Sequence, residues 1–323
     1  MMATMVRECG DAMGIQRMSD YESKALIAIH EWKDPSISWF DRIGELVNWP
    51  LSKAGDLVLD TPGVGAVIRK SVSGLVSMAN DLSQWSVRQE AIFEEYRDAG
   101  FDVSCHADLM KLDLENVDHT IGWLAAKYKT LAASEGAVTG LAGLPGIPAD
   151  VVALVSLNLR AIGEYATYCG FDVNTQQERL FALHVLGEAS SPTDASKTVA
   201  MAQLVKIAHE VAKKRVWKEL ERHAFVQIVQ QIAKAIGVRL TKAKLAAVIP
   251  GLGAAVSAGF NAYFTDKVCD AAFYLYRERF LAEKYADASI IEETTPPADT
   301  PDPRYPEANE ELPRSSDDLP DDE

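Results

Sequence analysis

Three times along this chain an apolar segment is interrupted by Pro-Gly and then resumes with small residues. The interruptions read TPGVG, LPGIP and IPGLG, at residues 61–65, 144–148 and 249–253. Proline stops a helix because it lacks an amide donor and clashes with the preceding turn, and glycine tolerates the reversed backbone that follows. Each interruption therefore predicts the tip of a hairpin of two helices. Their unequal spacing argues against a regular repeat array.

The rest of the pattern is helical as well. Ala25, Leu26, Ile29 and Trp32 fall on one face of a helix that begins at Tyr21, and a proline follows at position 35. No sustained alternation of polar and apolar residues between turn signals indicates a strand. We therefore predict an all-α fold, a helical bundle built from hairpins punctuated by glycine and proline.

Composition divides the chain into three parts. Residues 1–20 look loosely ordered, residues 21–286 form the predicted all-α domain, and residues 287–323 form a tail. That tail holds 13 acidic and 2 basic residues and seven of the fourteen prolines. It has too little apolar surface to offset the entropy of ordering, so we expect a disordered acidic tail.

Charge and cysteine content narrow the functional classes. The formal net charge is −15, and the body without its tail is also slightly acidic, which argues against a nucleic-acid partner. The four cysteines include no C-x-x-C pair, so neither a zinc site nor a disulfide framework is indicated. The first twenty residues lack the apolar core of a secretory signal, and we expect a cytoplasmic protein.

The segment LAAVIPGLGAAVSAGFNAYF, residues 245–264, has no charge. As one straight helix it would be about 30 Å long, enough to cross a bilayer. Pro-Gly near its start favours a hairpin instead. Three alternatives stay open: a soluble or peripheral body, a hairpin inserted at the inner face of the cell membrane, and true spanning helices. The residues expected to touch membrane or partner are Pro250, Gly251 and Leu252.

Small residues line both hairpins. Spacing of three or four residues places Gly136, Gly140 and Gly143 on one helix face, and Gly251, Ala255 and Gly259 on another. Smooth faces of this kind let two backbones approach closely. We therefore predict that the two hairpins pair through these faces at the centre of the fold.

A basic region around Trp217, which includes Lys214 and Arg215, lies in a long helical stretch. Nearby glutamates make a solvated helix face the ordinary interpretation. The alternative is a patch for anionic lipid headgroups.

No catalytic, metal-binding or cofactor motif is present, and an enzyme is less expected than a binding or structural protein. His30 and His209 each begin a pattern like H-E-x-x-H, but the second histidine is missing. Polar residues within apolar helices are the remaining candidates for binding. They are Asp150, Arg160, Glu164 and Asn261, and Arg160 and Glu164 are spaced to pair with each other.

Two blocks of sequence resemble the EcsC family of bacterial proteins. The first, residues 122–172, combines a small-residue helix, an Asp-containing turn, an Arg-containing helix and a corner with Tyr168, Gly170 and Asp172. The second, residues 237–280, contains RLTK, Ile249-Pro250, Gly253-Ala254 and Asn261. The resemblance covers about residues 21–284. It implies membrane association and a gene neighbourhood beside an ABC exporter linked to secretion, and it supplies no catalytic residues.

Two functions of different class follow from these observations. The first is a non-enzymatic, membrane-associated helical protein, accessory to a membrane transport or secretion system, whose partner is a membrane surface or a membrane protein. The second is a soluble lipid- or small-molecule-binding protein, or an unrecognised enzyme, with a pocket between the hairpins lined by Asp150, Arg160 or Asn261. The oligomeric state does not follow from the sequence.

Overall fold

The computed structural model describes residues 18–33, 64–80, 87–189, 236–238, 240–241, 244–245, 253–287 and 289–293. All regular elements in these ranges are helices, which confirms the all-α prediction. In chain order they are α2 (Asp20–Lys33), α4 (Val64–Asn80), α5 (Gln89–Asp98), α6 (His106–Leu109), α7 (Leu114–Ile121), α8 (Leu124–Gly140), the 3-10 turn η3 (Leu144–Gly146), α9 (Ile147–Tyr168), α10 (Gln176–Ala189), α13 (Gly253–Lys284) and α14 (Ser289–Glu293).

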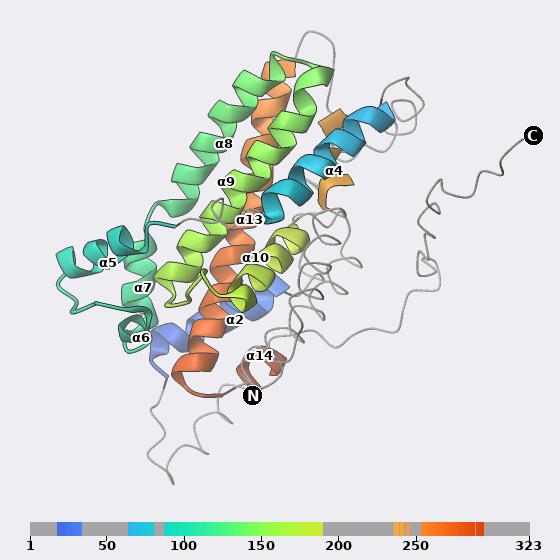
Figure 1. Ribbon diagram of the computed structural model, residues 1–323. Coiled ribbons are helices and arrows are strands. Elements are labelled where there is room, and N and C mark those ends of the chain that lie inside the picture. Colours follow the sequence, from blue (N-terminus) through green and yellow to red (C-terminus); the bar gives the residue numbers. More distant parts are fainter. Residues whose placement is uncertain are drawn as a thin grey trace, which may run out of the picture.

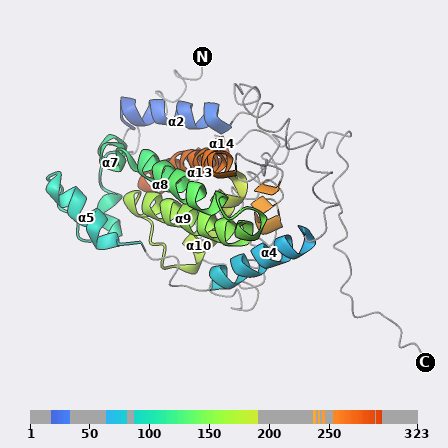
Figure 2. The same ribbon diagram turned by 90° about the horizontal axis from the view of Figure 1, so that it is seen from above.

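Three long helices, α8, α9 and α13, run side by side and form the body of the molecule (Figures 1 and 2). The predicted helix at Tyr21 is α2, which packs on one side of α13 with Ala25 and Ile29 buried. The helices α4 and α10 lie on the opposite side, and the short helices α5 to α7 lie to one side of the lower part of α8 and α9 (Figure 1).

The turn between α8 and α9 is the hairpin tip predicted from LPGIP. Gly143 has a φ of +60°, a conformation that side-chain-bearing residues rarely adopt. Pro145 then falls within η3, and Pro148 opens α9, where a missing amide donor costs nothing. The other two Pro-Gly tips lie outside the described residues, apart from the helices α4 and α13 that start beside them.

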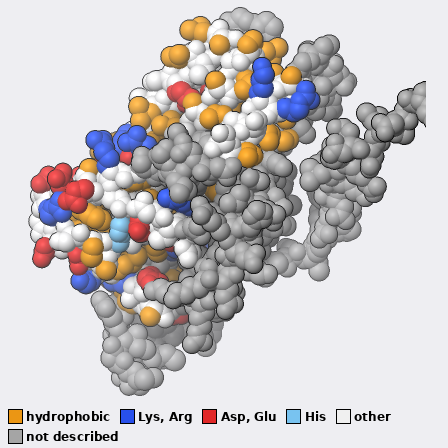
Figure 3. All heavy atoms as spheres, viewed as in Figure 1, with side chains coloured by type: hydrophobic (Ala, Val, Ile, Leu, Met, Phe, Trp, Pro, Cys, Tyr) orange, Lys and Arg blue, Asp and Glu red, His pale blue; other side chains and the backbone are white. Residues whose placement is uncertain are grey.

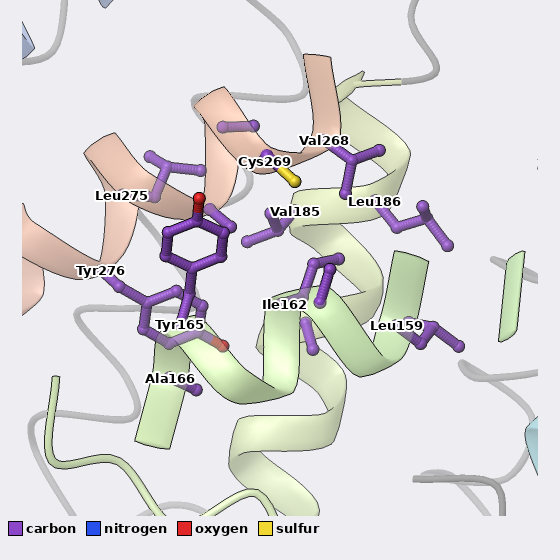
Figure 4. Close-up of a cluster of buried hydrophobic side chains, with 14 of the residues drawn as sticks. Leu159, Ile162, Tyr165, Ala166, Val185, Leu186, Val268, Cys269, Leu275 and Tyr276 are labelled. Atoms are coloured by element: carbon purple, nitrogen blue, oxygen red, sulfur yellow. The ribbon is translucent and has the colours of Figure 1, made fainter. Parts of the chain in front are cut away.

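The hydrophobic core lies where α9, α10 and α13 meet. Figure 4 shows Leu159, Ile162 and Tyr165 of α9 pointing toward side chains of the other two helices. α9 is buried on all sides from Ala161 to Cys169, because neighbouring helices cover each of its faces. Its composition is apolar for that reason, and it forms the central helix of the fold.

The end of α9 is the corner that carries part of the family resemblance. Gly170 has a φ of +81°, and a Cβ at this position would lie 3.0 Å from the carbonyl oxygen of His106. The backbone carbonyl of Tyr168 accepts a hydrogen bond from the Tyr96 hydroxyl at 2.9 Å. Asp172 then accepts hydrogen bonds from Gln89 and from the Asn174 amide, which fixes the turn toward α10.

Four charged side chains in the last two turns of α13 each have a buried partner on another element. Arg277 binds Asp118 of α7 at 2.8 Å, and Arg279 binds both carboxylate oxygens of Glu178 on α10. We call these pairs the charged base of the bundle. The two remaining pairs of the charged base join α13 to α2. They are Glu278 with Lys33 and Lys284 with Glu22.

Candidate functional site

At the end of the bundle opposite the charged base, the described residues include a region that has no charged group on its surface. It comprises residues 130–159, from the upper half of α8 through η3 into α9, and residues 253–265 of α13. The only charged residues in these ranges are Glu135 and Asp150, and both carboxylates point inward. The eleven residues of α8 in this range span about 16 Å at 1.5 Å per residue. We call this region the charge-free end.

Large apolar side chains project from the charge-free end into solvent. Val138 is 71% exposed, Leu141 80% and Leu144 39%, whereas apolar side chains of this size are usually buried. Figure 3 shows the corresponding surface over α8 and α9 as mainly hydrophobic and neutral, with a small acidic spot within it and Lys and Arg side chains beside it on α4. This surface was not predicted, although LAGLP at residues 141–145 already shows an apolar tip.

One exposed ion pair marks the lower limit of the charge-free end. Lys129, one residue before it on α8, lies 2.9 Å from Asp266, one residue after it on α13. Both side chains are about half exposed. The change from a charge-free to a charged surface therefore occurs at the same level on two neighbouring helices.

The interior of the charge-free end contains a polar cluster among buried apolar side chains such as Val151 and Leu154. Asp150 of α9, Asn261 of α13 and Lys244 are 3%, 0% and 4% exposed. Lys244 donates to both the Asp150 carboxylate and the Asn261 carbonyl oxygen, and the Asn261 amide donates to Asp150 Oδ1 at 3.1 Å. Ser257 adds a further hydrogen bond to Asp150 at 3.3 Å. Burial lowers the pKa of Lys244, and the Asp150 charge opposes that change.

A second polar layer lies deeper in the bundle, between α9 and α13. Asn158 donates to the Thr265 hydroxyl at 3.1 Å, and both side chains are fully buried. The Asn158 side-chain carbonyl has no hydrogen-bond partner. Buried polar layers beneath exposed leucine and valine side chains are uncommon in a soluble bundle, where buried polar groups are the exception.

The predicted pairing of two glycine faces is right for α8 and wrong for α13. A Cβ on Gly136 would lie 2.6 Å from the carbonyl oxygen of Ser257 and 2.7 Å from the Asn261 amide nitrogen, so α8 and α13 touch here. Ala255 and Gly259 are exposed, and a Cβ on Gly259 would meet nothing. The face of α13 that contacts α8 is the polar one, because Ser257 and Asn261 carry the hydrogen bonds to Asp150.

Glu135 lies beside this polar cluster on α8. Both its carboxylate oxygens are inaccessible to solvent and have no hydrogen-bond partner. Burial, with a smaller contribution from the Asp150 charge, raises the pKa of Glu135 to about 7, and Lys244 partly opposes the shift. Glu135 was not among the predicted binding residues, although it is the only charged residue in the upper half of α8.

The four candidate binding residues do not form one site. Asp150 and Asn261 meet in the cluster, together with Lys244, which was not among the predicted binding residues. Arg160 and Glu164 pair with each other at 3.6 Å, as their spacing predicts, and Lys127 also binds Glu164. The candidate membrane or partner contacts lie outside the described residues, and they are Pro250, Gly251, Leu252, Trp217, Lys214 and Arg215.

Two further observations bear on the class of protein. Within the described residues, no group of His, Cys, Asp and Glu side chains is arranged to hold a metal ion. One described helical stretch, Leu144–Tyr168, is long and apolar enough to cross a membrane. It includes the central helix α9, and a buried core helix passes the same test, so this is weak support for a spanning segment.

Fold and site together define a class: an all-α protein whose long helices end in an apolar, charge-free surface around a buried polar cluster. Comparison with known families assigns the particular group. Residues 26–281 match the EcsC protein family, and the chain belongs to that family.

Two relatives from Bacillus subtilis (strain 168) show how far the similarity extends. Protein EcsC is 27% identical over 179 residues, which cover 54% of this chain and 69% of the relative. The uncharacterized protein YdbA is 22% identical over 177 residues, 55% of this chain and 62% of the relative. No solved structure matches the chain.

Proposed function

We propose that this protein is a non-enzymatic, membrane-associated protein that places its charge-free end in one leaflet of a bilayer. The carrying observation is the surface of that end, where Val138 and Leu141 face outward and no charged group is exposed, because Asp150 and Lys244 face inward. In water the exposed leucines and valine are unfavourable, whereas in hydrocarbon they are favourable and the inward ionic groups stay shielded.

The dimensions support insertion into one leaflet. The hydrocarbon core of a bilayer is about 30 Å thick, so one leaflet contributes about 15 Å. The charge-free part of α8 is about 16 Å long. At that depth the exposed Lys129–Asp266 pair would lie among the headgroups, where charged side chains are tolerated.

The alternative of a small-molecule pocket has less support. Arg160 lies with Glu164 and Lys127, away from the cluster, while Asp150 and Asn261 bond to each other and to Lys244. An accessory role beside a membrane transport or secretion system is the further proposal that the family resemblance implies. Membrane placement of this chain is a precondition for that role.

Vesicle flotation at pH 6 tests membrane association. We expect the intact protein to float with neutral phosphatidylcholine vesicles and to stay bound at high salt, because apolar insertion is not screened. The double variant Val138→Asp/Leu141→Asp should bind at least about 100-fold more weakly, since each aspartate costs about 2.5 kcal/mol or more in hydrocarbon.

Ile27→Asp is the matched control, because Ile27 is 58% exposed on α2, away from the charge-free end. This variant should float like the unaltered protein. Failure of the unaltered protein to float at pH 6 would refute the proposal. Equal binding by the double variant would show that the charge-free end is not the inserted surface.

A further inference from the structure

Glu135 is unlike the other buried ionic groups of the charge-free end. Asp150 and Lys244 bond to each other and to Asn261, whereas neither carboxylate oxygen of Glu135 has a partner or contact with solvent. A buried carboxylate without hydrogen bonds is costly, because it has lost its water and gained nothing in exchange.

The neighbours of Glu135 do not supply a full counter-charge. Asp150 faces it from α9 and repels a second negative charge, while Lys244, the one cation that faces it among the described residues, already binds Asp150. From α13 come Ser257 and Asn261, which are uncharged, and α8 has no other charge between residues 130 and 140. With Glu135 ionised the cluster therefore carries a net charge of −1 among the described residues.

One added proton makes the cluster neutral. We propose that Glu135 is the proton-binding group of the charge-free end, and that insertion into a bilayer requires its carboxylate to take up a proton from solvent. The only bond formed is the O–H bond on Glu135. The inference rests on the proposed membrane association and adds a regulation to it, since acidification would promote binding.

The physical reason is the cost of a net charge in hydrocarbon. In water, the ionised and neutral forms of Glu135 are both accessible near neutral pH, since burial raises its pKa to about 7. In a bilayer, an unpaired charge costs several kcal/mol, so the neutral form is favoured further. Linkage then requires that membrane affinity fall as pH rises above the pKa that Glu135 has in the unbound protein.

Vesicle flotation between pH 5.5 and 8.5 measures this dependence. With phosphatidylcholine vesicles, which keep the same charge over this range, the partition coefficient should fall by up to about tenfold per pH unit above pH 7. Glu135→Gln keeps the shape of the side chain and cannot ionise. This variant should bind equally well across the range and at least about tenfold more tightly than the unaltered protein at pH 8.5.

Asp98→Asn is the matched control, because it removes one carboxylate from an exposed position on α5. It should keep the pH dependence of the unaltered protein. If Glu135→Gln retains that dependence, or if the unaltered protein binds equally at all pH values, the proton-binding role is wrong while membrane association stands. If no form floats even at pH 5.5, both proposals are wrong.

A titration without vesicles tests Glu135 alone. The side-chain carboxyl signals of glutamates labelled with carbon-13, assigned by comparison with Glu135→Gln, should show Glu135 titrating near pH 7 in the folded protein. Titration below pH 5 would overturn the inference even if membrane binding proved dependent on pH. This measurement uses the unaltered chain, so it does not depend on how well any variant folds.

Discussion

The two halves of α13 bury polar groups in different ways. In the charged base, Arg277, Arg279 and Lys284 each bind a carboxylate from a different element, and these pairs connect α13 to α7, α10 and α2. In the charge-free end, α13 supplies only uncharged groups, Ser257 and Asn261, to a cluster that includes the unpaired Glu135.

The difference indicates two roles for buried charge. A paired buried charge specifies which elements meet, because a mismatched partner would be left uncompensated. An unpaired carboxylate instead responds to pH within the neutral range. The charged base is therefore expected to hold the fold together, and the charge-free end to be the part whose state depends on its surroundings.

The largest effect is expected in the charged base. Arg279 binds both oxygens of Glu178, and its guanidinium lies 4.1 Å from the ring centres of Phe171 and Phe181. Arg279→Met leaves Glu178 buried without a partner and should lower the free energy of unfolding by about 3–5 kcal/mol. Urea denaturation measures the free energy of unfolding. Adding Glu178→Leu should recover much of the loss, and a double variant no better than the single one would contradict this account.

The two regions should respond to pH in opposite directions. Burial alone would raise the pKa of Glu22, but hydrogen bonds from Lys284, Tyr285 and the Ser19 amide outweigh it and lower the pKa to about 2 from 4.5. Ionised Glu22 therefore stabilises the fold above pH 4.5. This contribution, on the order of 3 kcal/mol, is lost as pH falls from 4.5 to 2.

The contribution of Glu135 to stability changes with pH in the opposite direction, because the pKa of Glu135 is raised from 4.5 to about 7. The folded protein then binds more protons than the unfolded chain between these values, so its contribution to stability falls as pH rises through that window. Urea denaturation at a series of pH values separates the two effects. Glu22→Gln should flatten the acid side of the profile and Glu135→Gln the side between pH 4.5 and 7, and an exchange of these effects would refute the comparison.

A smaller effect is expected where α8 and α13 touch. Gly136→Ala places a methyl group 2.6 Å from the Ser257 carbonyl oxygen, which forces the backbones apart. We expect a loss of about 1–3 kcal/mol, typical of overpacking. Gly259→Ala is the control, because its Cβ meets nothing, and it should be neutral or stabilising by up to about 1 kcal/mol. Equal stabilisation of both variants would show that helix propensity, and not close packing at Gly136, determines the effect of the substitution.

The sequence predicted the helices and the α8–α9 tip because these depend on local rules. Proline and glycine determine the turn at residues 143–148, and the spacing of Ala25 and Ile29 determines the buried face of α2. The pair Arg160–Glu164 was predictable for the same reason, since one helical turn separates its members.

The cluster could be predicted only in part, because its members are far apart in the chain. Asp150 and Asn261 were selected as polar residues in apolar helices, and the structure shows them 3.1 Å apart. Which face of α13 meets α8 depends on hydrogen bonds to Asp150, so the small-residue pattern pointed to the wrong face. Glu135 was missed because one glutamate in a helix is ordinarily solvated. Its unpaired state arises from tertiary packing.

The smallest effect is expected at the boundary between the two regions. The Lys129–Asp266 pair is exposed at 48% and 43%, so Lys129→Gln should change the free energy of unfolding by less than about 1 kcal/mol. At the proposed depth Lys129 lies among headgroups. Its loss should then weaken binding to vesicles containing phosphatidylglycerol by about 1 kcal/mol, roughly fivefold, and leave binding to phosphatidylcholine unchanged. Equal weakening on both vesicles would place Lys129 within hydrocarbon and the boundary nearer the base.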